Sequence, residues 1–129
     1  MTAEDPRQDP LPSPAHGLSV RWSLAQAPSD VAERLRHYVT GTSLRRFSGM
    51  PGLRFKTWRM REGEWFEGTY VFASAAERDA FAASFGATAA ESPGSQIIGS
   101  PPVTIEPFEV VAVAEGAAGF AAGAGPGVP

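Results

Sequence analysis

The sequence predicts a single α+β domain in which the elements follow the order strand, helix, strand, strand, helix, strand. Three observations lead to this prediction. Two strand-like runs, at 50–58 and 65–72, are separated by a short polar loop that contains a glycine, which is typical of a β-hairpin. A strand and a helix precede this hairpin, and a helix and a strand follow it. That order is the ferredoxin-like, or split βαβ, arrangement with a four-stranded antiparallel sheet.

The first strand and helix are predicted by their periodicity. Every second residue from Leu18 to Leu24 is apolar and the residues between them are polar, which indicates a strand with one apolar face. Asp30, followed three residues later by Glu33, forms a capping pattern at the start of a helix. The apolar stripe of this helix extends through residue 39, and Gly41 is expected to end it.

The second helix and the last strand are predicted in the same way. Ser74 and Glu77 form another capping pattern, which opens a helix that ends at Gly86. Residues 87–102 contain three prolines and two glycines and are predicted to form a long loop, with room for one helical turn. Residues 103–114 are predicted to form the last strand.

Length and composition indicate one folded domain with two tails. The chain has 129 residues, of which 43% are hydrophobic and 19% are charged, as in globular proteins. Residues 1–16 hold four prolines, and residues 117–129 are almost entirely Ala, Gly and Pro. We therefore expect disordered tails at 1–16 and 117–129 and a domain at 17–116.

Several classes of function are excluded or disfavoured by the sequence. The chain has no cysteine, so it can form neither a disulfide nor a thiolate metal site. Its two histidines, His16 and His37, belong to no metal-ligand spacing, and no nucleotide-binding fingerprint is present. The net charge of -3 and the lack of a recognition motif argue against nucleic acid. With no apolar run of 18 residues and no signal-peptide pattern, we expect a cytoplasmic protein that uses neither metal nor cofactor and contacts no membrane.

The positive charges are concentrated in one segment. Residues 34–61 contain eight cations and no Asp or Glu, and three glutamates follow at 62, 64 and 67. This segment would attract an anionic ligand or an acidic carrier protein. The alternative is a solvated surface whose cations pair with the neighbouring glutamates.

The hairpin supplies the candidate site. Alternation places Arg54, Lys56 and Trp58 on one face of the first strand, and it places Phe66, Gly68, Tyr70 and Phe72 on one face of the second. If the two faces coincide, aromatic side chains would enclose a planar substrate, and Gly68 would leave room for its ring. Lys56 or Arg54 would then stabilise an enolate or phenolate. The alternative is that the aromatic residues belong to the core and that Lys56 extends to solvent.

Two further candidates lie outside the hairpin. His37 would act as a general base or proton donor, or it is simply an exposed helix residue. Ile97 and Ile98 form an apolar pair in the predicted 87–102 loop, so we expect both to be buried against the pocket or against a second subunit.

The hairpin and the helix after it also resemble a known family. Met50-Pro51-Gly52-Leu53 leads into Lys56-x-Trp58, and Gly68-x-Tyr70-x-Phe72 is followed by a Ser-x-x-Glu helix start. This series is similar to the small mono-oxygenase family of the dimeric α+β barrel superfamily, over residues 17–115. The resemblance implies a dimeric α+β barrel, and it implies oxygenation of a planar aromatic or polyketide-type substrate without a cofactor. A homodimer is also indicated by the hairpin strands, which carry apolar residues on both faces.

Two other functions remain open on the same fold. A cyclase or isomerase would move protons without consuming dioxygen, with Tyr70 or His37 as the proton source. An accessory dimer would bind a ligand or a carrier protein without catalysis.

Overall fold

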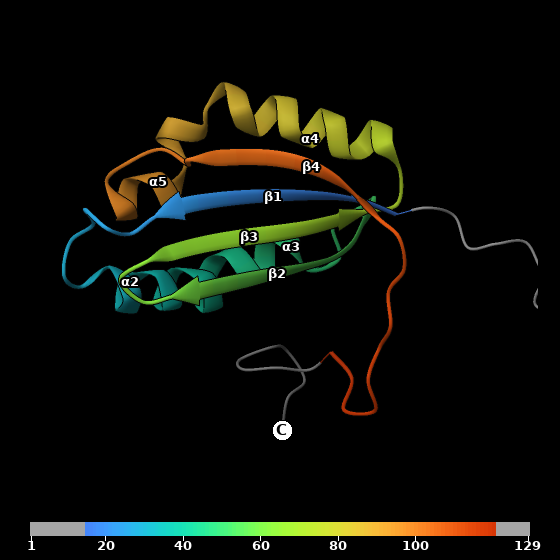
Figure 1. The fold of residues 1–129 in the computed structure, drawn as a ribbon, viewed down its shortest axis with the longest axis horizontal. Coiled ribbons are helices and arrows are strands. Elements are labelled where there is room, and N and C mark those ends of the chain that lie inside the picture. Colours follow the sequence, from blue (N-terminus) through green and yellow to red (C-terminus); the bar gives the residue numbers. More distant parts are fainter. Residues whose placement is uncertain (1–14, 121–129) are drawn as a thin grey trace, which may run out of the picture.

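The computed structural model describes residues 15–120, which form a four-stranded antiparallel sheet covered by helices on one face (Figure 1). The strands are β1 (Ala15–Ser23), β2 (Leu53–Arg61), β3 (Trp65–Phe72) and β4 (Thr104–Val110), in the spatial order β2-β3-β1-β4. Helical segments connect β1 to β2 and β3 to β4. The fold is therefore the ferredoxin-like arrangement that the sequence predicts.

The first helical segment is longer than predicted. It consists of α2 (Val31–Tyr38), the π-helix η1 (Val39–Ser43) and α3 (Leu44–Phe47), so Gly41 lies within it and the prediction that Gly41 ends the helix is wrong. The continuation buries Ser43 and Phe47 against the sheet, and such packing outweighs the low helix propensity of glycine. Asp30 occupies the N-cap position, but its side chain makes no capping hydrogen bond, contrary to the predicted pattern.

For the second helical segment, one prediction is confirmed and one is wrong. In α4 (Ala75–Ala87) the Ser74 hydroxyl accepts a 3.1 Å hydrogen bond from the Glu77 N–H, as the capping pattern predicts. The predicted 87–102 loop is instead mostly helical, with the 3₁₀-helix η2 (Ala89–Glu91) followed by α5 (Pro93–Ile98). Ser92 caps α5, and Gly99 ends it with a positive φ of 91°.

The core lies between the sheet and the helices. The alternation predicted for β1 is confirmed, since Leu18, Val20 and Trp22 are all buried on the helix-covered face. Ile98 joins this core at 2% exposure, whereas Ile97 is only partly buried beside it. The short helix α5 thus fixes the end of the second helical segment to the sheet.

The ends of the domain differ slightly from the predicted boundaries. β1 begins at Ala15, so His16 is a strand residue, and β4 ends at Val110. Of the two predicted tails, 1–14 and 121–129 lie outside the described residues. Between residues 15 and 120, no helix has the length and apolar character needed to span a membrane.

Candidate functional site

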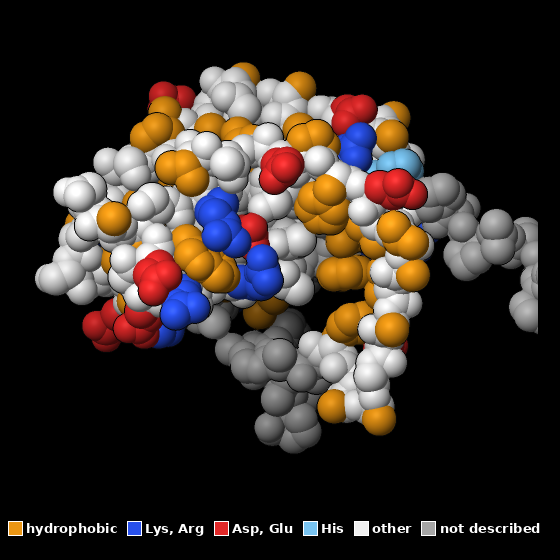
Figure 2. Space-filling view, in the orientation of Figure 1, with side chains coloured by type: hydrophobic (Ala, Val, Ile, Leu, Met, Phe, Trp, Pro, Cys, Tyr) orange, Lys and Arg blue, Asp and Glu red, His pale blue; other side chains and the backbone are white. Residues whose placement is uncertain are grey.

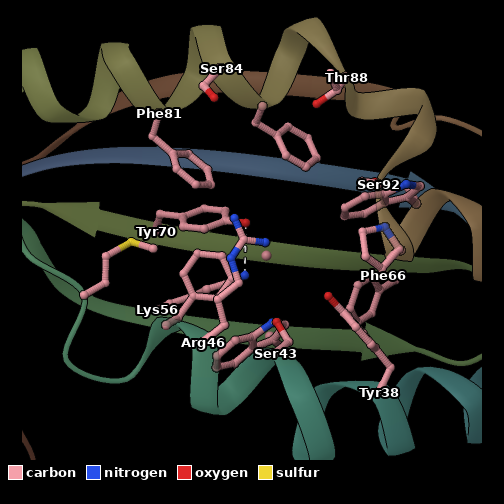
Figure 3. Close-up of a pocket in the computed structure, with 18 of the residues that line it drawn as sticks. Tyr38, Ser43, Arg46, Lys56, Phe66, Tyr70, Phe81, Ser84, Thr88 and Ser92 are labelled. Atoms are coloured by element: carbon pink, nitrogen blue, oxygen red, sulfur yellow. Dashed lines mark hydrogen bonds between the residues drawn. The ribbon is translucent and has the colours of Figure 1, made fainter.

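A cavity of about 380 Å³ lies between the sheet and the helices, within the size range of small-molecule sites. Figure 3 shows that side chains from both layers converge on it. The sheet contributes Trp22, Lys56, Trp58, Phe66, Gly68 and Tyr70, and the helices contribute Tyr38, Ser43, Arg46, Phe47, Phe81, Ser84 and Phe85. Its lining is therefore mainly aromatic, with a few polar groups.

Lys56 places an amine inside this aromatic lining. It is the only lysine in the chain. Its Nζ donates a 3.0 Å hydrogen bond to Tyr70 Oη, drawn as a dashed line in Figure 3. The same Nζ lies 3.6 Å from the ring centroid of Phe47, 4.2 Å from that of Tyr70 and 4.5 Å from that of Trp58. The amine is thus held by one hydroxyl and three aromatic faces.

This environment changes the charge state of Lys56. Burial, and to a smaller extent the nearby Arg46 guanidinium, lower its pKa from 10.5 to about 6. The aromatic faces favour the ammonium form and therefore oppose this shift in pKa. At neutral pH the amine is largely uncharged, so it can accept a proton or attack an electrophile.

Tyr70 behaves in the opposite way. Burial raises the pKa of its phenol well above the usual value, so the hydroxyl keeps its proton at neutral pH. Its ring is fixed by Phe47 at 5.6 Å and by Phe81 at 4.8 Å between centroids. The cavity therefore holds an uncharged amine beside a phenol that can donate a hydrogen bond.

The first helical segment contributes polar side chains to the cavity, among them Ser43 and Arg46. The π-helix η1 carries Ser43, whose Oγ accepts a 3.1 Å hydrogen bond from Trp58 Nε1 and so fixes the indole. From α3, Arg46 points into the cavity beside Lys56 and Tyr70 (Figure 3). Arg46 is not among the predicted site residues, although it is one of the eight cations of the basic segment 34–61.

The other end of the cavity is closed by η2 and α5. Trp22 Nε1 donates a buried 3.0 Å hydrogen bond to Ser95 Oγ, which itself donates to the Ala89 carbonyl at 2.6 Å. Gly94 lies against the Trp22 indole, where an added Cβ would be 3.2 Å from the ring. These contacts attach the segment 87–102, predicted as a loop, to the sheet.

Five of the residues predicted from the hairpin meet at this cavity. They are Lys56, Trp58, Phe66, Gly68 and Tyr70. Trp58 and Gly68 are direct partners across β2 and β3, so the two predicted faces coincide. At Gly68 an added Cβ would lie 3.2 Å from Lys56 Cε, so the absence of a side chain there leaves space beside the amine.

The other predicted residues lie elsewhere. Arg54 does not line this cavity, because the β2–β3 register shifts between Leu53 and Phe55 and leaves Arg54 exposed at this bulge. It borders a smaller hollow of about 190 Å³, which Lys56 and Trp58 also line. Phe72 is buried in the core at 2% exposure and does not line the cavity. His37 is exposed on α2, in a separate hollow that it shares with Ile97.

The opposite face of the sheet holds a second polar group. Figure 2 shows cations gathered around acidic and apolar side chains on this open face. Glu67 is buried there at 5% exposure, where it accepts a 2.6 Å hydrogen bond from Ser19 and forms ion pairs with Arg21 and Arg59. Burial alone would raise the pKa of Glu67, but these hydrogen bonds and charges lower it on balance.

Three cations of the basic segment 34–61 pair with the three glutamates that follow it: Arg36 with Glu62, Arg59 with Glu67, and Arg61 with Glu64. The segment also contributes Arg46 and Lys56 to the cavity. Within residues 15–120, no group of three His, Cys, Asp or Glu side chains is arranged to hold a metal ion.

Two solved structures are similar to this one. A protein of unknown function from Nitrosomonas europaea is 23% identical, with a TM-score of 0.58 over 82% of this chain and 98% of that chain. A putative antibiotic biosynthesis monooxygenase from Chloroflexus aurantiacus is 18% identical, with a TM-score of 0.40 over 81% of this chain and 99% of that chain. No family model and no curated protein matches the sequence. The first similarity supports the ferredoxin-like fold, and it leaves the activity to be argued from the cavity.

Proposed function

We propose that the cavity binds a planar phenol or enol and that Lys56 removes its acidic proton. The observation that carries this proposal is the position of the Lys56 amine, enclosed by aromatic faces and 3.0 Å from the Tyr70 hydroxyl. Aromatic walls favour a flat substrate, and the uncharged amine is a base suited to neutral pH. After it takes the proton, the ammonium lies next to the new anion and stabilises it, together with Arg46.

Oxygenation without a cofactor is the leading reaction for such an anion. An electron-rich phenolate can donate electrons to dioxygen directly, so the protein need only bind it, exclude water and hold its charge. For a naphthol the balanced reaction is C₁₀H₈O + O₂ → C₁₀H₆O₂ + H₂O, in which one oxygen atom enters the ring and the other leaves as water. This chemistry also agrees with the mono-oxygenase family that the hairpin motifs resemble.

A cyclase or isomerase is the second candidate, and the Lys56–Tyr70 pair favours it. The two groups have opposite protonation preferences, because burial lowers the pKa of the amine and raises that of the phenol. A base and a proton donor 3.0 Å apart can move a proton between two positions of one substrate. Because His37 lies in another hollow, Tyr70 is the proton donor in this proposal.

The open face of the sheet is the proposed site of homodimer formation. Helices cover only the opposite face, and the open face carries the apolar side chains of Val71, Phe55 and Phe108 beside the Glu67 ion pairs. A second copy would bury this face, as the family resemblance implies. An accessory role, with an acidic carrier protein docking on the cations left unpaired by glutamates, is the remaining non-catalytic proposal.

The experiment that tests the enzymatic proposal is turnover of a series of naphthols, followed by chromatography and an oxygen electrode. We expect kcat to rise with pH through a midpoint of about 6, as Lys56 loses its proton. Lys56→Met should lower kcat by about 10²- to 10⁴-fold, the usual contribution of a general base. If the naphthols are converted equally fast without dioxygen, the oxygenation proposal is wrong and the cyclase or isomerase proposal takes its place.

Two neighbouring arginines provide the matched control. Both side chains are exposed on the same helix α3, but Arg46 lines the cavity and Arg45 does not. Arg46→Met should weaken naphthol binding, and Arg45→Met should leave binding unchanged. Equal effects of the two substitutions would contradict the assignment of the anion site.

A further inference from the structure

Lys56 is a partly buried lysine with an unusual setting. Among the described residues no ion pair joins it to a carboxylate, and the nearest charged group that affects it is another cation, Arg46. A buried lysine usually gains a carboxylate partner, which keeps it charged. Here its contacts are one hydroxyl and three ring faces, so no carboxylate holds the amine in its charged form at the wall of the cavity.

We propose that Lys56 forms a reversible imine with an aromatic aldehyde or ketone bound in this cavity. The proposal deepens the proposed function, on which it rests, because it names the substrate class as planar carbonyl compounds and adds a covalent step at the same amine. Two conditions for this chemistry are met by the geometry. The nucleophile is desolvated beside a second cation, and a cavity of about 380 Å³ adjoins it.

The step is balanced without any further reactant. The Nζ lone pair attacks the carbonyl carbon, a C–N bond forms, and the carbonyl oxygen takes a proton to give a carbinolamine. The nitrogen then loses a proton and the C–O bond breaks, so the net reaction is R–NH₂ + R′R″C=O → R–N=CR′R″ + H₂O. The Tyr70 hydroxyl, 3.0 Å from Nζ, is the closest side-chain group that can donate a proton to the departing oxygen.

The surroundings of the amine provide space for the ligand. Gly68 lies opposite Trp58 across the hairpin, and it has no side chain to fill the space beside Lys56 Cε. Trp58 is held by its hydrogen bond to Ser43, so its indole can form a fixed wall for an aromatic ring. Arg46, at the same cavity, would attract a carbonyl compound that also bears an acidic hydroxyl.

The test uses the full chain with 2-naphthaldehyde and sodium cyanoborohydride, which reduces an imine to a stable secondary amine. Intact mass should increase by the probe mass less one oxygen atom, and peptide mapping should place the adduct on Lys56. Because Lys56 is the only lysine, the α-amino group is the only other primary amine in the chain. Labelling at pH 7 confined to the α-amino group would overturn the proposal.

A relocated lysine is the matched control. Arg61 is exposed on the same strand β2, with its side chain 69% accessible. In the double variant Lys56→Met, Arg61→Lys the only lysine is exposed and keeps a pKa of about 10.4, so labelling should be at least tenfold slower at pH 7. Equal labelling of the two sites would contradict an activated amine. Tyr70→Phe should slow adduct formation while the same residue remains labelled.

Tryptophan fluorescence separates the failure of this inference from that of the proposed function. Trp22 and Trp58 both line the cavity, so a bound naphthalene ring should quench their emission. Quenching without a Lys56 adduct would disprove the imine and leave the noncovalent site intact. Neither quenching nor adduct formation, with naphthol or naphthaldehyde, would disprove both.

Discussion

Lys56 and Tyr70 are direct partners across β2 and β3, and their side chains are joined by a 3.0 Å hydrogen bond. Side chains of directly opposed residues lie on the same face of a sheet, close enough to interact. The pairing of the amine with the phenol is therefore set by the hairpin register. The following predictions test this arrangement and its surroundings.

The free energy of unfolding should rise with pH above neutrality because of Lys56. Its pKa is about 6 in the folded state and 10.5 in the unfolded state, so between these values only the unfolded chain binds the extra proton. Raising the pH makes binding of that proton less favourable and so destabilises the unfolded state, at most by about 1.4 kcal/mol per pH unit. The slope should appear in urea unfolding between pH 7.5 and 9. Lys56→Met should abolish it, and a slope that persists in this variant would assign it to another group.

Gly68→Val should reduce ligand binding more than it reduces stability. Even a single Cβ at this position would be 3.2 Å from Lys56 Cε and 3.4 Å from the Tyr70 ring, so a branched side chain would displace the amine and fill the space beside it. We expect at least a tenfold loss of naphthol affinity by fluorescence titration. Gly86→Val in α4, where nothing lies within 4 Å of the added Cβ and φ is not positive, is the control for a glycine substitution that meets no neighbour. Unchanged affinity in Gly68→Val would exclude binding beside Lys56.

Ser95→Ala should destabilise the end of the cavity formed by α5. The substitution leaves the buried Trp22 N–H without its 3.0 Å partner, and an unpaired buried donor costs about 1–3 kcal/mol. Urea unfolding followed by circular dichroism would measure this loss. The exposed Ser100 is the control position, where alanine should change the free energy of unfolding by less than about 0.5 kcal/mol. Equal costs at the two positions would show that the Trp22 bond is not important.

Glu67→Gln should lower stability above pH 5 and have less effect in acid. The pKa of Glu67 is lowered in the folded state, so its ionised form contributes stability that is present above the unfolded pKa and is lost as the pH falls through the folded one. We expect a cost of about 1–3 kcal/mol at pH 7, because Arg21 and Arg59 lose their shared anion. Glu64→Gln removes the exposed Arg61 ion pair and should cost about 0–1 kcal/mol. A constant difference between wild type and Glu67→Gln from pH 3 to 7 would contradict the ionised pair.

The proposed homodimer predicts a specific response to charge on the open face. Thr57 and Thr69 oppose each other across β2 and β3 on the same face as Glu67. Thr57→Glu should shift the protein from dimer to monomer in sedimentation at micromolar concentration. The exposed Thr40, after α2, is the control position for the same substitution. If the wild-type protein is a monomer under these conditions, the homodimer proposal is wrong.

Alternation in the sequence was sufficient to predict most of the sheet and to bring together five residues that line the cavity. It correctly placed Leu18, Val20 and Trp22 toward the helices, and it brought Trp58 and Gly68 onto one face. It failed at Arg54, because a β-bulge changes the parity of a strand and depends on the register of its partner strand. A single strand sequence does not contain that information.

The helical errors have different causes. The sequence around α5 did contain its signals, with Ser92 as the cap, Pro93 in the first turn and Gly99 at the end. Because Pro and Gly are also typical of turns, the same residues led to the prediction of a loop. Arg46 could not be placed by local reasoning, because α3 exists only as the continuation of a π-helix whose buried residues pack on the sheet.

The two edge strands of the sheet carry features that disfavour pairing with strands of other molecules. β2 and β4 are the outer strands, and an outer strand offers free backbone groups to any extended chain in solution. β4 contains Pro107, which has no N–H to donate, and β2 carries Arg54, Arg59 and Arg61 along its length. Addition of a further strand at either edge is therefore disfavoured, so association through the sheet face does not lead on to growth along the sheet edges.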